Sequence, residues 1–129
     1  TFHRAFDITR DPVEALEAIR SLGVSRLLTS GQKNKALDGA ELIAKLQEEA
    51  GKSLKIMAGG GINEQNIAAL AQKTNILAFH ASMTEVVESN MQFRQRDVSM
   101  GGLPDIPEYS RKITSAARVR KMIDILEGI

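Results

Sequence analysis

The sequence has no cysteine and no tryptophan, and aromatic residues make up only 4% of its 129 residues. Without cysteine, a disulfide framework and a thiolate metal site are excluded within these residues. The sequence also lacks an excess of either charge, since it has 17 Lys and Arg residues and 16 Asp and Glu residues. No apolar run approaches the ~20 residues that cross a bilayer. We therefore expect a cytoplasmic protein without nucleic-acid or membrane partners.

The remaining composition suits one globular domain, with 43% apolar and 26% charged residues. Short apolar runs predict four strands, and stripes at spacings of three and four residues predict helices between and after them. Residues 83–114 show little periodicity. The predicted strands are residues 1–4, 24–29, 54–58 and 76–80, and the helices begin at Asp11, Asp38, Asn63 and Thr114 or Ser115.

Four strand–helix units with short connections predict an α/β fold with a parallel sheet. An open doubly wound sheet and half of a (β/α)₈ TIM barrel both fit this repeat. Polar residues and glycines gather where the strands end, and the glycine-rich turn follows the third strand, which is wrong for a dinucleotide-binding fold. These two features favour the half-barrel, with parallel strands inside and helices outside.

A half-barrel would leave two strand edges unpaired and its inward side chains without an opposite wall. We therefore predict that residues 1–129 are the C-terminal half of a single TIM-barrel domain in a longer chain. The alternative is that two copies close against each other.

Two histidines, His3 and His80, lie at the ends of the first and last predicted strands. Strand alternation places them on the face opposite Phe2 and Phe79, near the mouth of the barrel. Imidazole titrates near neutral pH and binds metals, so the pair is a candidate for acid–base or metal chemistry. The alternative is a pair of hydrogen-bonded core histidines.

Arg4 and Asp7 flank the loop after the first predicted strand. The planar guanidinium of Arg4 could bind a carboxylate or phosphate. Asp7 could act as a general base or a metal ligand. A structural ion pair that holds the loop is an equally good interpretation.

Glycine-rich turns are the other candidates. Gly59, Gly60 and Gly61 precede a predicted helix, and glycines let backbone amides approach an anion closely. In barrels, the loops after the last two strands often form a phosphate site, which would add Ser82. The turn at Ser30 and Gly31 also suits a ligand. The alternative is a set of tight turns without a ligand.

These residues lie in segments that resemble consecutive motifs of the CutC family of copper homeostasis proteins. The resemblance implies a full (β/α)₈ barrel of about twice this length, of which the sequence would hold strands five to eight. It also implies a cytoplasmic protein linked to copper, which forms homodimers or higher homo-oligomers. The segments are residues 1–7, 28–32, 57–62, 79–82, 93–94, 98–100 and 108–110.

The resemblance places the candidate residues at the mouth of the family's barrel. One hypothesis is a copper homeostasis protein, with copper implied by the resemblance alone because the two histidines and scattered methionines form no convincing ligand set. The alternative is a TIM-barrel enzyme acting on a small anionic or phosphorylated substrate at the carboxyl face of the strands. The candidate catalytic residues are His3, Asp7 and His80, and the candidate anion-binding residues are Arg4, Ser30, Gly31, Gly59, Gly60, Gly61 and Ser82.

Overall fold

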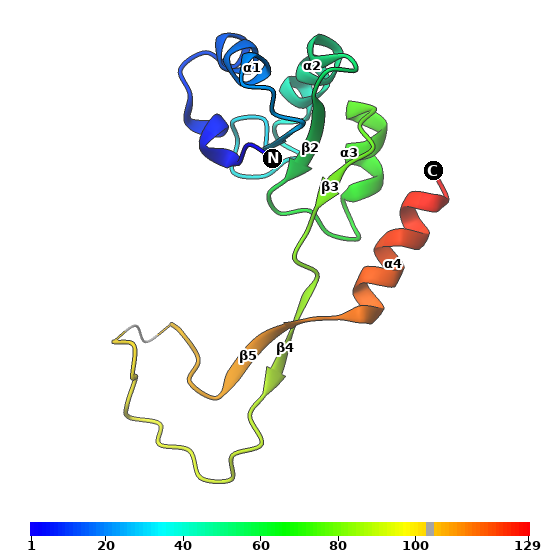
Figure 1. The fold of residues 1–129 in the computed structure, drawn as a ribbon. Coiled ribbons are helices and arrows are strands. Elements are labelled where there is room, and N and C mark those ends of the chain that lie inside the picture. Colours follow the sequence, from blue (N-terminus) through cyan, green and yellow to red (C-terminus); the bar gives the residue numbers. More distant parts are fainter. Residues whose placement is uncertain (103–104) are drawn as a thin grey trace. The chain divides into compact units, whose positions relative to one another are not determined.

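The computed structural model describes residues 1–102 and 105–129 (Figure 1). The chain forms two compact units, of which the first comprises Thr1–Ala81 with Lys121–Ile129 and the second comprises Ser82–Arg120. Among the described residues, no helix is both long enough and apolar enough to span a membrane.

The first unit contains a parallel sheet in the order β1-β2-β3, formed by Arg26–Thr29, Lys55–Gly59 and Phe79–His80. An isolated parallel bridge from Phe2 to Leu27 lies on the other side of β1. The sheet confirms the predicted α/β class and parallel pairing. Two predicted strands are shorter than expected, because the first is a single bridge and the last keeps only two residues.

Helices α1, α2 and α3 span Pro12–Ser21, Ala40–Ala50 and Ile67–Thr74. The predicted start of α1 is confirmed, since the carboxylate of Asp11 accepts hydrogen bonds from the amides of Val13 and Glu14. The other two helices begin later than predicted. Their N-cap residues, Gly39 and Asn66, make no side-chain cap.

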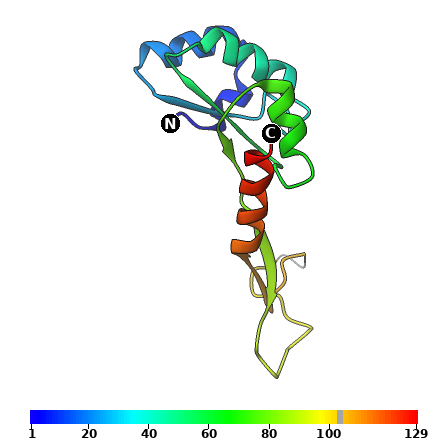
Figure 2. The same ribbon diagram turned by 90° about the vertical axis from the view of Figure 1, so that its right-hand side faces the viewer.

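One face of the sheet is covered by helices, as Figure 2 shows for α1, α2 and α3. Leu27, Ile56 and Ala58 lie on this face and are at most 1% exposed. Their neighbours Leu28 and Met57 point to the opposite face and are only half-buried. Within the described residues of this unit, the second face carries no layer of helices.

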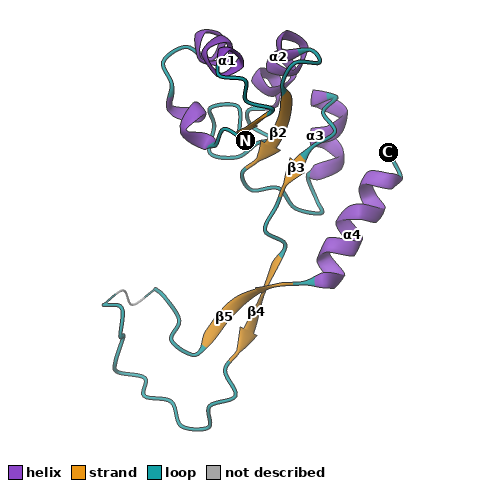
Figure 3. Cartoon of the chain, viewed as in Figure 1, coloured by secondary structure: helices purple, strands orange, loops and turns teal. Residues whose placement is uncertain are grey.

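The second unit contains an antiparallel pair that the sequence analysis missed (Figure 3). Strand β4, Thr84–Glu88, pairs with β5, Ser110–Thr114. Helix α4 spans Ala116–Glu127 and begins directly after Ser115, one of the two predicted starts. Its first residues belong to the second unit and its last residues to the first.

Candidate functional site

Asp7 is the centre of a hydrogen-bond network at the carboxyl end of β1. It lies in a short 3-10 helix, η1, that spans Arg4–Ile8, and its side chain is only 6% exposed. The carboxylate accepts hydrogen bonds from Thr29 Oγ1 at 2.5 Å, Ser30 Oγ at 2.8 Å and Arg4 Nε at 2.7 Å. The amides of Ser30 and Gln32 also donate to it, at 3.0 and 3.2 Å.

These donors determine the protonation of Asp7. Burial by itself raises the pKa of the carboxyl, but the hydrogen bonds from Thr29, Arg4 and Ser30 outweigh burial and hold the pKa below 3.8. Asp7 is therefore ionised at neutral pH, with its oxygens surrounded by donors. This geometry favours the structural ion pair over a general base, which needs a pKa closer to neutral.

Arg4 is anchored along one edge of its guanidinium group. Nε donates to Asp7, while Nη2 donates to Ser30 Oγ at 2.7 Å and to the carbonyl of Lys33 at 3.3 Å. The third nitrogen, Nη1, lies 3.5 Å from the position that a Cβ atom on Gly60 would occupy. Nη1 makes no hydrogen bond with residues 1–102 or 105–129. Nε and Nη2 are thus fixed, and Nη1 alone is without a partner among the described residues.

The loop after β1 packs against the glycine turn after β2. The amide of Ala36 donates to the carbonyl of Gly60 at 2.9 Å. Gly31 has a φ of +68°, and a Cβ atom there would lie 2.2 Å from the carbonyl oxygen of Gly39. Gly31 is therefore required for a close approach of two backbone segments. Its predicted role in anion binding has no support in this geometry.

His3 and His80 lie at opposite edges of the sheet. His3 Nδ1 accepts a hydrogen bond from the amide of Ala5 at 3.0 Å and so caps η1. His80 in β3 pairs with Gly59 in β2, and the Cβ of His80 lies 3.4 Å from the Cβ position of that glycine. Three strand spacings of about 4.8 Å separate the two edges by roughly 14 Å. The first unit alone therefore does not bring the two imidazoles together.

The side chain of Leu28 occupies the space into which a side chain at position 59 would point. A Cβ atom on Gly59 would lie 2.6 Å from Leu28 Cδ1. Glycine at this position thus leaves room for Leu28 on the uncovered face. This packing accounts for the first glycine of the triplet without a ligand.

Thr29 is a member of the network that the sequence analysis did not identify. Its hydroxyl donates to Asp7 and accepts from the amide of Gly31 at 2.9 Å, and the residue is fully buried. A hydroxyl at the last position of a buried strand was the available signal. Ser82, in contrast, is exposed and begins the second unit.

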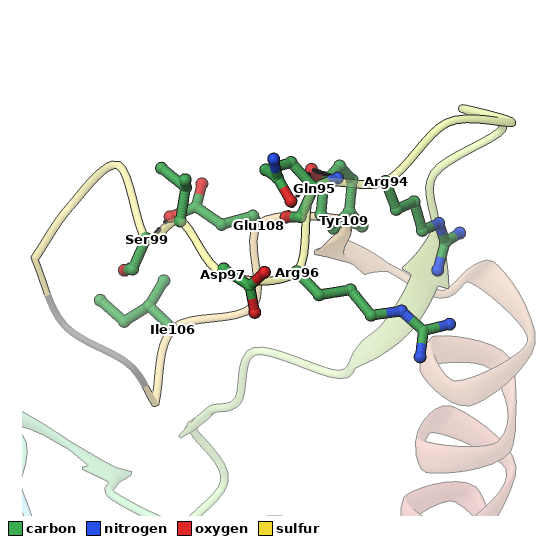
Figure 4. A pocket seen from close by; sticks show the side chains of 9 residues that line it. Arg94, Gln95, Arg96, Asp97, Ser99, Ile106, Glu108 and Tyr109 are labelled. Carbon is green, nitrogen blue, oxygen red and sulfur yellow. Dashed lines mark hydrogen bonds between the residues drawn. The ribbon is translucent and has the colours of Figure 1, made fainter.

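A separate hollow of about 490 Å³ lies in the second unit (Figure 4). Several of its polar groups already have partners, since Glu108 accepts from the amide of Met100 at 2.6 Å and Tyr109 is hydrogen-bonded to Gln95. The guanidinium groups of Arg94 and Arg96 extend away from the Ser99 side of the hollow. We therefore consider the network around Asp7 the better candidate site. The hollow is lined by residues 94–99, Ile106, Glu108 and Tyr109.

Comparison with known proteins shows similarity along the whole chain. The model of the CutC family matches residues 1–85. A family protein CutC from Porphyromonas gingivalis is 48% identical over all 129 residues, which cover 52% of that protein. The human copper homeostasis protein cutC homolog is 40% identical over the same residues, which cover 47% of it. The chain thus spans about half the length of these relatives.

A solved structure gives the same assignment. The crystal structure of the putative copper homeostasis protein CutC from Streptococcus agalactiae superimposes with a TM-score of 0.57 and 30% sequence identity. The match covers 61% of this chain and 40% of that one. The family match includes more than half of the chain, and it agrees with the motifs around Asp7 and the glycine turn. The chain belongs to the CutC family.

Proposed function

We propose that this chain acts in copper homeostasis, as part of a CutC-type protein in the cytoplasm. The observation that carries the proposal is the 40% identity, over the entire chain, with the human protein named for copper homeostasis. Similarity at this level extends over both the parallel sheet and the β4–β5 pair. The functional relationship therefore does not depend on a single motif.

We also propose that residues 1–129 form strands five to eight of a single (β/α)₈ barrel. The Phe2 bridge and the three parallel strands are neighbours in the sheet in the same order as in the sequence, as consecutive strands of a (β/α)₈ barrel are. In the described part of the first unit, helices cover one face of the sheet and leave the other without a helical layer, and the chain spans about half the length of its relatives. In this arrangement Leu28 and Met57 point into the barrel.

Copper would be cargo of such a protein, and the residues of this chain do not fit a complete copper site. Monovalent copper prefers thiolate and thioether ligands, and the sequence contains no cysteine. Among the described residues, no group of three or more His, Asp or Glu side chains could hold a metal ion. Copper binding would therefore need donors from outside these 129 residues, and we derive no step through the metal.

Homo-oligomer formation is a related proposal. Parallel strands with open edges and an uncovered face expose groups that a second copy or further strands of the same chain can pair with. Light scattering on the full-length protein measures its mass directly. A single monomeric species at micromolar concentrations would contradict the homo-oligomer and leave the barrel proposal intact.

An enzyme acting on a small anionic, phosphorylated substrate is less well supported. Asp7 is ionised and saturated with donors, and His3 uses Nδ1 as a cap. His80 is then the remaining candidate for proton transfer. Arg4 Nη1, which has no hydrogen-bond partner among the described residues, favours an anionic ligand, but anion binding does not require catalysis.

The copper proposal is tested in cells that lack their own CutC-family protein. Expression of the full-length protein should restore the copper content of the cells and their growth in added copper, without changing their zinc content. The Gly31→Ala variant should fail to restore them because it disrupts the loop after β1. The Gly51→Ala variant, in which the new Cβ meets open space, is the matched control. Equal copper content with and without the protein would refute the proposal.

A further inference from the structure

We propose that the turn after β2 binds the phosphate group of a small molecule. The site consists of Arg4, Lys35, Gly60 and Gly61, and we call it the glycine-turn site. It lies where a parallel strand ends, which is where α/β proteins bind their ligands. The proposal goes beyond copper homeostasis and does not depend on it.

The first argument is the fixed orientation of Arg4. Three of its neighbours, Asp7, Ser30 and the carbonyl of Lys33, hold Nε and Nη2. The guanidinium is therefore oriented before any ligand arrives, which lowers the entropy cost of binding. Nη1 lies 3.5 Å from the Cβ position of Gly60, where it can donate a charge-assisted hydrogen bond to one phosphate oxygen.

The second argument is the backbone of the turn. Gly60 and Gly61 have φ values of +117° and +68°, a conformation that glycine adopts without strain. A Cβ atom on Gly60 would lie 3.2 Å from Ser30 Cβ, so this glycine packs closely against the loop after β1, whereas Gly61 is exposed and its backbone is accessible to a ligand. The amide of Gly61 donates to no acceptor within residues 1–102 and 105–129. A turn that exposes an amide in this way can donate it to an anion.

The third argument is a second cation beside the turn. Lys35 Cγ lies 3.2 Å from the Cβ position of Gly61, so the aliphatic part of the lysine follows the turn. Lys35 is exposed and makes no ion pair with the described residues. Arg4 and Lys35 thus border the same two glycines. Two cations and a free amide suit a dianionic phosphate.

A purely structural role for Arg4 would explain its bonds to Asp7 and Ser30. It would not require Lys35 or the open Nη1. The two interpretations therefore differ in what happens at Lys35, which takes no part in the network. This difference determines the design of the experiment.

The experiment titrates inorganic phosphate into the ¹⁵N-labelled full-length protein at constant ionic strength. We expect saturable shifts in the amide resonances of Gly60 and Gly61, with chloride as the reference anion. Lys35→Ala should weaken phosphate binding several-fold, and Arg4→Lys, which replaces all three guanidinium nitrogens by one ammonium group, by at least about tenfold. The exposed Lys52→Ala, which changes the same charge elsewhere, should bind phosphate like the original protein.

Three results would overturn the proposal. They are an absence of saturable shifts, shifts confined to residues outside the turn, and equal effects of Lys35→Ala and Lys52→Ala. If Arg4→Lys does not fold, the comparison of the two lysine variants still decides. Copper content in cells is a separate readout, so failure of this experiment leaves the copper proposal standing.

Discussion

Thr29 Oγ1 donates a 2.5 Å hydrogen bond to Asp7 Oδ1 and thereby joins the end of β1 to η1. The two residues are 22 positions apart in the sequence, with the whole of α1 between them. The same carboxylate also accepts hydrogen bonds from Arg4 Nε and Ser30 Oγ. Asp7 therefore determines the conformation of two loops at the carboxyl end of the sheet.

We predict that Asp7→Asn destabilises the protein by roughly 2 kcal/mol, because an amide nitrogen replaces an oxygen that several donors share. Urea unfolding measures the change. Glu17→Gln is the matched control, since Glu17 forms an exposed pair with Arg20 and its loss should cost well below ~1 kcal/mol. Equal stability of Asp7→Asn and Glu17→Gln would contradict the importance of the network.

The stabilising effect of Asp7 should depend on pH. Its folded-state pKa lies below 3.8, so the unfolded chain binds the proton more readily. The stabilisation is therefore fully present above about pH 4 and is lost as the pH falls through the folded-state pKa. The difference in unfolding free energy between the original protein and Asp7→Asn should shrink below pH 4. A difference that grows as the pH falls would contradict the assigned direction.

The sequence predicts much of this network's surroundings but not the network itself. The start of α1 follows from local chemistry, because Asp11 and the amides that it accepts from are two and three residues apart. The Arg4–Asp7 pair was also a local possibility. Thr29 was not identified because its bond to Asp7 depends on how distant segments pack.

The errors have similar physical causes. Asp38 and Asn63 looked like caps, but α2 begins after Gly39, and Asn63 Oδ1 accepts from the amide of Gln65 in the preceding turn. The β4–β5 pair was missed because polar residues such as Glu85 and Lys112 interrupt any apolar alternation in its sequence. Both strands are largely exposed. Local polarity indicates a turn or a cap without deciding which.

Gly31→Ala should lower stability far more than Gly51→Ala. Both glycines have positive φ values, +68° and +55°, so each substitution incurs backbone strain of about 1–2 kcal/mol. The added Cβ meets the Gly39 carbonyl in the first case and open space in the second. We expect melting temperatures that fall by several degrees more for Gly31→Ala. Matching losses would contradict the close approach of the two loops.

Copper bound by the full-length protein should not depend on the two histidines. His3 and His80 lie at opposite edges of the sheet, and His3 is used as a cap. We predict the same copper stoichiometry for a double variant, His3→Asn with His80→Ala, because the asparagine side chain can still cap η1. Elemental analysis after equilibration with monovalent copper measures it. Loss of the metal would place copper ligands in this half of the barrel.

Oxidation of Met57 by peroxide in the longer chain tests the half-barrel most directly. Met57 is on the uncovered face of the sheet, whereas Met100 is 83% exposed and serves as the internal reference. If further strands close the barrel, Met57 should oxidise about tenfold more slowly than Met100, and equally fast after unfolding in urea. Comparable rates for Met57 and Met100 in the folded chain would show that the face stays open and would contradict the barrel.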